Sequence, residues 1–123
     1  MTVLFEPRVG IRVDELEDEL ARAFEYMRRA VLDGFAVVVE LDETALEGRG
    51  DVASAALAHG LLGLVRAFAL EGRKHGWRVS AISSTANTSA AERVAWTEQL
   101  ADSQEATGTL LRLGGQHLGR VPT

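Results

Sequence analysis

Polar side chains that could do chemistry follow two predicted strands. Asp42 and Glu43 come directly after an apolar run at residues 35–41. Ser84 follows a second such run, at residues 77–83. Parallel α/β sheets bind ligands at the carboxyl ends of their strands, so the two carboxylates could act as a general base or hold a partner. The hydroxyl of Ser84 could bind a phosphate or a carboxylate. The start of a solvated loop also explains all three residues, and we favour it.

Two further polar side chains lie in the most apolar part of the chain. Ser54 and His59 fall within residues 52–74, whose composition predicts a long buried helix. A nucleophilic serine needs a neighbouring base, and none is evident beside Ser54. Serine near the start of a helix is commonly a cap. His59 could act as an acid or base, but we favour a packing or capping role.

Neither cysteine nor histidine indicates a metal site. The chain has no cysteine, which excludes disulfides, thiolate metal sites and a cysteine nucleophile. His59, His75 and His117 share no metal-ligand spacing. His75 follows Arg73 and Lys74 at the end of the predicted helix, where the helix dipole favours cations. We therefore expect no bound metal.

Length and composition restrict the class of protein. A chain of 123 residues is enough for one domain with one core, and a mean hydropathy of +0.01 is ordinary for a soluble globular protein. A net charge of −5 argues against nucleic acid as a partner, because that affinity comes largely from neutralising phosphates. No signal peptide is recognisable, and with no cysteine we expect a cytoplasmic protein.

Hydrophobic patterning predicts strands and helices in alternation. In chain order we expect strands at residues 2–5, 35–41, 77–83 and 109–113, and helices at residues 14–33, 52–74 and 90–100. Residues 42–51 are expected to be a polar loop. This order predicts a parallel α/β sheet. The apolar window Val52–Leu70 contains His59 and Arg66, which favours a buried helix over a membrane span.

Residues 54–82 carry a family resemblance. Residues 63–71 read Gly-Leu-Val-Arg-Ala-Phe-Ala-Leu-Glu, and residues 76–82 read Gly-Trp-Arg-Val-Ser-Ala-Ile. The first run resembles the helix of the short-chain dehydrogenase/reductase family, which opens with Tyr-x-x-x-Lys and continues Gly-Leu-x-Arg-Ala-x-Ala-x-Glu. The second resembles the turn and strand that follow it in that family. Residues 107–115 resemble the family's terminal Thr-Gly-Gln-x-Leu-x-Val-Asp-Gly-Gly, one residue short.

The resemblance also shows what the chain lacks. In its register Ser54 takes the place of the catalytic Tyr and Ala58 that of the Lys, and the family's catalytic Ser falls near Leu41 or Asp42. No Gly-x-x-x-Gly-x-Gly turn follows the first predicted strand. The resemblance thus implies a single truncated domain, residues 1–123, without the N-terminal dinucleotide-binding half. We expect a partial Rossmann-like parallel sheet of three to four strands, with no cofactor.

The favoured hypothesis is a non-catalytic, dehydrogenase-like subunit that forms oligomers. In the family, the two helices matching residues 14–33 and 52–74 pack against their counterparts in a second subunit. Both are rich in small and apolar residues here, as close helix packing requires. The interface residues would be Leu20, Phe24, Met27, Gly60, Gly63, Leu64 and Ala67. The partner would be a second copy or a full-length reductase, which the chain would serve as a structural or regulatory subunit.

Two other hypotheses remain open. The chain could be a small enzyme or ligand-binding protein that reuses the former pocket for non-redox chemistry, through Asp42, Glu43, His59 and Ser84. It could also be an active reductase completed by a second polypeptide. The last is disfavoured because Ser54 replaces the tyrosine that would relay the proton.

Overall fold

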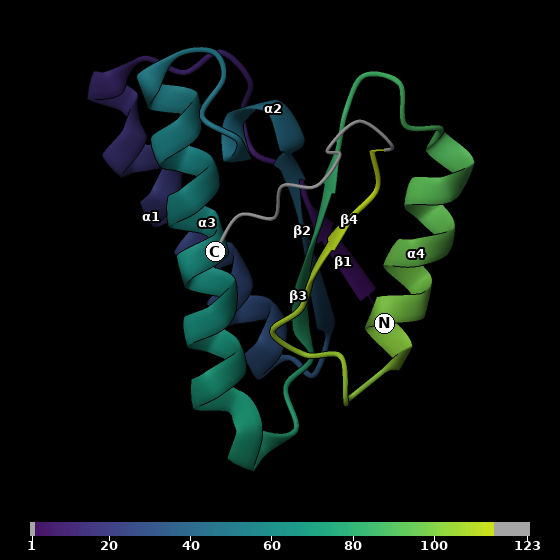
Figure 1. The fold of residues 1–123 in the computed structure, drawn as a ribbon. Coiled ribbons are helices and arrows are strands. Elements are labelled where there is room, and N and C mark those ends of the chain that lie inside the picture. Colours follow the sequence, from purple (N-terminus) through teal and green to yellow (C-terminus); the bar gives the residue numbers. More distant parts are fainter. Residues whose placement is uncertain (1, 115–123) are drawn as a thin grey trace.

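Four parallel strands form one sheet, in the order in which they occur along the chain (Figure 1). The computed structural model describes residues 2–114. The strands are β1 (Thr2–Phe5), β2 (Ala36–Asp42), β3 (Val79–Ser84) and β4 (Leu110–Arg112). In the register of the sheet, Val3 pairs with Val37, Val39 with Ala81, and Ala81 with Leu110. The predicted fold class, a partial Rossmann-like parallel sheet flanked by helices, is confirmed.

Helices connect the strands and cover both faces of the sheet. They are α1 (Leu16–Leu32), α2 (Glu43–Leu46), α3 (Val52–Glu71) and α4 (Ala90–Asp102), with single turns of 3-10 helix at Val13–Glu15 and Gly72–His75. α1 and α3 lie on one face of the sheet and α4 lies on the other (Figure 1). After α1 the chain turns at Gly34, whose φ of +83° is a conformation that glycine adopts readily, and it then enters β2.

The loop expected at residues 42–51 contains a helix instead. α2 is only four residues long, so it has no room for the periodic pattern that identifies a helix in a sequence. The carboxylate of Asp42 accepts a hydrogen bond of 3.0 Å from the backbone N–H of Thr44 and caps this helix.

The continuous apolar run of β2 is buried on both faces, as its sequence predicted. Val37 and Val39 face α1 and α3 and belong to the larger hydrophobic cluster. Val38 faces α4, where it packs in a smaller cluster with Ile82 and Leu100. Because side chains alternate along a strand, only an uninterrupted apolar run can serve a sheet that is covered on both sides.

α3 is the central helix of the core. With the 3-10 turn that follows, it is long and apolar enough to cross a membrane, judged by length and composition alone. Its inner side is enclosed, since Leu61 and Val65 are 0% exposed, and it packs against α1, β2 and β3. Its outer side carries Val52 and Leu70, which are 76% and 67% exposed.

The two glycines of α3 have different surroundings. A Cβ at Gly60 would lie 2.9 Å from Leu20 Cδ2, so this glycine lets α1 approach α3 closely. A Cβ at Gly63 would meet nothing within 4 Å. Met27, expected in the interface set, is 0% exposed and belongs to the core, because its side of α1 faces the sheet rather than solvent.

Candidate functional site

The four residues expected to share a pocket are divided between three places. Asp42 and Ser84 line one open groove at the carboxyl ends of the strands. Glu43 is buried beneath α2 and is 1% exposed. His59 lies on the exposed surface of α3, where Nε2 lies 2.9 Å from the backbone oxygen of Leu46 and ties α3 to α2. The fold therefore brings together only the pair at the ends of β2 and β3.

Glu43 is the centre of a buried polar cluster. Oε1 accepts hydrogen bonds from Ser83 Oγ at 2.6 Å and from Arg112 Nε at 3.1 Å, and Oε2 accepts one from Arg112 Nη2. Burial lowers the pKa of Arg112, because removal from water disfavours the charged guanidinium. A substrate would have no access to this carboxylate. The cluster instead clamps α2 to β3 and β4.

The positions that match the family's Tyr and Lys lie one turn apart on α3. Ser54 and Ala58 both line a cavity of about 80 Å³. Most of the other side chains around this cavity are apolar, including Leu41, Leu57 and Leu61. Pockets for small molecules usually have about 300–1,000 Å³, so this cavity has room for a few water molecules and none for a nicotinamide ring.

Ser54 is not the cap of α3. That role belongs to Asp51, whose carboxylate accepts a hydrogen bond of 2.6 Å from the backbone N–H of Ser54. The pKa of Asp51 is lowered chiefly by the hydrogen bond from the backbone N–H of Ser54, and further by one from the Ser54 hydroxyl. Both stabilise the charged form of the carboxylate. An aspartate directly before an apolar helix is the sequence signal that indicates this cap.

The groove that contains Asp42 and Ser84 lies on the side of the sheet that α4 covers. Its volume is about 540 Å³. Glu40, on β2, also lines it, as does Arg93 from α4. Oε1 of Glu40 accepts hydrogen bonds from Arg93 Nη1 at 2.5 Å and Ser84 Oγ at 3.4 Å. Glu40 was not among the residues expected at a site, although a lone glutamate within the apolar run at residues 36–41 is a usable signal.

Nothing in residues 2–114 resembles a metal centre. No group of three or more histidine, cysteine, aspartate or glutamate side chains in this part of the chain is placed to hold an ion. His117 lies outside the described residues, as do Gly115 and the rest of the C-terminal tail. The connection from β1 to α1, where a dinucleotide site would need several glycines, contains only Gly10.

The fold defines the class of this protein. A parallel sheet in sequential strand order, with helices on both faces and a groove at the carboxyl ends of its strands, is a partial Rossmann-like fold.

Similar solved structures are dehydrogenases and reductases. The structure resembles acetoin dehydrogenase from Enterobacter cloacae, with a TM-score of 0.64 at 19% identity over 93% of this chain and 62% of that one. It also resembles a putative 3-oxoacyl-reductase from Bacillus thuringiensis, with a TM-score of 0.62 at 16% identity over 95% and 60% of the two chains. A third is acetoin dehydrogenase from Salmonella typhimurium, with a TM-score of 0.66 at 15% identity over 99% and 66%.

These similarities show the fold alone, since every identity is below 20%. They agree with the resemblance to short-chain dehydrogenases drawn from residues 54–82. The chain spans about three fifths to two thirds of each neighbour, so it matches only a part of that architecture. No protein-family model and no curated protein sequence matches the chain.

Proposed function

We propose that this chain is a non-catalytic, dehydrogenase-like subunit that associates through the outer face of α1 and α3. Its partner is a full-length reductase or dehydrogenase, which it serves as a structural or regulatory subunit in the cytoplasm. Assembly with a second copy of itself through the same face is the alternative.

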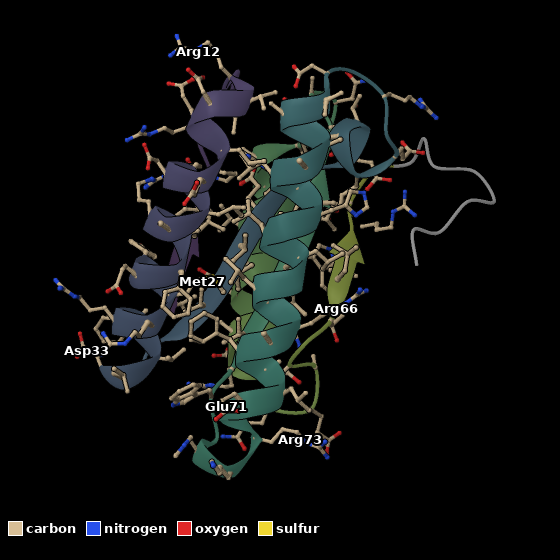
Figure 2. The ribbon with its side chains drawn as sticks, turned by 90° about the vertical axis from the view of Figure 1, so that its left-hand side faces the viewer. Arg12, Met27, Asp33, Arg66, Glu71 and Arg73 are labelled. Carbon is tan, nitrogen blue, oxygen red and sulfur yellow. The ribbon has the colours of Figure 1, made fainter. Side chains whose placement is uncertain are left out.

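The observation that carries this proposal is a mainly apolar groove between α1 and α3 on that outer face, with Arg28 and Glu71 at its margin. Phe24 and Leu32 of α1 are 42% and 60% exposed. A groove of about 520 Å³ between the helices is lined by Phe24, Leu64 and Ala67. Figure 2 shows α1 and α3 side by side with this face toward the viewer. Large exposed apolar patches on a folded domain mark interaction surfaces, and the exposed Gly63 and Ala67 would let another helix approach closely.

The composition of the small cavity supports a non-catalytic role. In the family that the chain resembles, a tyrosine acts as acid and base, and a lysine lowers the pKa of that tyrosine. Here Ser54 takes the place of the tyrosine, and the methyl group of Ala58, in the place of the lysine, carries no charge that could act on it. Leu41 and Asp42 at the end of β2 supply no hydroxyl either.

An edge of the sheet is a second reason to expect a partner. β1 pairs with β2 alone among the described strands, so the other side of Thr2–Phe5 presents backbone hydrogen-bonding groups without a neighbouring strand. No charged residue or proline lies within this strand. Native monomers usually protect such edges, because an unprotected edge pairs with other chains.

The test is a pull-down of the tagged chain from its native host, followed by measurement of the solution mass of the eluted complex. We expect a full-length reductase at fixed stoichiometry. Ala67→Glu should abolish its recovery, because a carboxylate would be buried in the apolar interface. Ala91 is exposed on α4, on the opposite side of the sheet. Ala91→Glu is therefore the matched control and should retain the partner.

Other outcomes separate the alternatives. A homodimer that Ala67→Glu converts to a monomer would support the proposed surface on α1 and α3. It would show that the partner is a second copy of the chain and not a reductase. A stable monomer without any partner would refute the proposal. Nicotinamide-dependent turnover by a reconstituted complex, lost when Ser54 is replaced by alanine, would show instead that the chain completes an active reductase.

A further inference from the structure

The outer edge of β1 is open to another strand. Among the described strands, β1 pairs with β2 alone. In an edge strand, backbone N–H and C=O groups that point away from the sheet are available to pair with another chain. Thr2 is exposed, and Val3 and Leu4 are half-buried, so a partner can reach this strand. The hydrogen bonds that its backbone offers are those that a β-strand satisfies.

A groove of about 390 Å³ lies beside this edge. Val3 lines it from β1, and Arg22 and Tyr26 are among the residues that line it from α1. Steps of 100° per residue place these two on the side of α1 opposite Phe24 and Arg28, which line the groove toward α3. The groove therefore lies on the free side of β1, where the next strand would run about 4.8 Å away.

The lining of this groove favours an uncharged, apolar side chain. Val3, Ala30 and Phe35 supply apolar surface. The charged residues among the described lining balance, since two arginines face two carboxylates: Arg22, Arg29, Glu25 and Asp33. Because opposite charges are present in equal number, neither an anionic nor a cationic side chain gains a net attraction there.

We propose that β1 binds an extended segment of a partner polypeptide as a fifth strand of the sheet. The backbone of the segment forms hydrogen bonds with the outer edge of β1. Every second side chain points toward the α1 face, and an aliphatic one among them fills the groove beside Val3. Sheet edges recognise peptides in this way, through main-chain hydrogen bonds and pockets for alternate side chains.

This edge is a different surface from the outer face of α1 and α3. The two grooves lie on opposite sides of α1, so either can be occupied without the other. Failure of the pull-down through Ala67 would leave the binding of a strand intact, and failure of strand binding would leave the association through α1 and α3 intact.

The experiment is an NMR titration of the ¹⁵N-labelled full chain with the heptapeptide Lys-Val-Thr-Val-Thr-Val-Lys, blocked at both ends. As a strand, this peptide presents valines on one face and threonines on the other. We expect saturable shifts of the amides at residues 2–6 and 26–35, and slower hydrogen exchange in β1. Shifts confined to residues 110–113, at the other edge of the sheet, would contradict the proposal.

Two N-methylated analogues of the peptide test the hydrogen bonds themselves. One carries methyl groups on two valine nitrogens and the other on two threonine nitrogens. Successive N–H groups of a strand point to opposite edges, so each analogue loses donors on one edge only. We expect one analogue to bind at least about tenfold more weakly than the other. Equal affinities would show that the peptide does not bind as a strand.

A charge placed at the edge should block binding. Val3→Lys should weaken peptide binding about tenfold, because natural proteins use lysine to protect edge strands. Leu111→Lys is the matched control, since Leu111 is also half-buried in an edge strand, on the opposite side of the sheet, and it should retain the affinity.

The absence of saturable shifts in the native chain would overturn the proposal, as would equal losses of affinity in the two lysine variants. The titration of the native chain with the peptide and its analogues needs no variant to fold, so it decides the matter even if a substitution disrupts the structure.

Discussion

At the scale of single residues, the buried ion pair between Arg112 and Glu43 should contribute strongly to the stability of the fold. Its side chain is 8% exposed and that of Glu43 is 1% exposed, so both charges lie almost entirely out of water. Glu47 also lies near, with its Oε2 4.0 Å from Arg112 Nη2. A buried pair of charges is tolerated only while both are present, because each compensates the desolvation of the other.

We therefore predict that Arg112→Met lowers the free energy of unfolding by about 3–5 kcal/mol, since it leaves Glu43 buried without its counter-charge. The double variant Glu43→Met/Arg112→Met should be clearly more stable than Arg112→Met alone. Urea denaturation followed by circular dichroism measures both.

The matched control is Arg12→Met, which removes an exposed ion pair with Asp14 at 3.0 Å. It should change the free energy of unfolding by less than about 1 kcal/mol. Equal losses in Arg112→Met and Arg12→Met would show that the buried cluster contributes no more than a surface pair.

At the level of elements, Glu19 in the first turn of α1 binds the loop that connects β1 to α1. Glu19 is 1% exposed and accepts hydrogen bonds from the backbone N–H of Arg8 at 2.8 Å and from Arg22 at 2.7 and 2.8 Å. The pKa of Glu19 lies below its ordinary value of 4.5, mainly because Arg22 donates hydrogen bonds to the carboxylate. Burial acts in the opposite direction and raises the pKa.

This contact predicts a pH dependence of stability. The pKa of Glu19 is lower in the folded chain than in the unfolded chain, so its ionised form stabilises the fold above pH 4.5, and that contribution is lost as the pH falls through the lowered value. Glu19→Gln should reduce the free energy of unfolding at pH 7 by about 1–3 kcal/mol. It should also reduce the loss of stability as the pH falls below 4.5.

Denaturation at a series of pH values measures this effect, with Glu17→Gln, an exposed neighbour, as the control. Parallel pH profiles for the native chain and Glu19→Gln would contradict the assignment.

Across the whole molecule, charge is distributed unequally along the paired helices. Residues 12–19, which lead into α1, contain one arginine and five carboxylates. Residues 71–78, at the end of α3 and just beyond it, contain two arginines, one lysine and one glutamate. α1 and α3 run in the same direction, and in Figure 2 Arg12 lies at one end of the pair and Arg73 at the other. A partner with similar helices would therefore match these charges best in the antiparallel orientation.

From this distribution we predict that association through α1 and α3 weakens with salt. The dissociation constant of the complex should rise severalfold between about 50 and 500 mM sodium chloride, because ions screen the attraction between the two ends. Analytical ultracentrifugation at several salt concentrations measures it. Lys74→Glu should weaken the complex at low salt and reduce its salt dependence. Association that salt leaves unchanged would indicate an interface held by apolar contacts alone.

Local patterns were enough to predict the order of the strands and longer helices and the burial of β2 on both faces. Apolar periodicity and continuous apolar runs are properties of neighbouring residues, so they can be read directly from the chain. The same patterns did not predict α2, whose four residues are too few to show a period, and they assigned Met27 to a surface although that side of α1 faces the core.

The composition of the candidate site depended on contacts between residues far apart in the chain. Glu43 meets Arg112 across 69 positions, and Glu40 meets Arg93 across 53. Only the register of β2, β3 and β4 and the placement of α4 on the far side of the sheet bring these groups together. The sequence alone could place Asp42 and Ser84 at strand ends. The tertiary structure decided that they share a groove with Glu40, because contacts of this kind follow from strand pairing and crossover rather than from any local pattern.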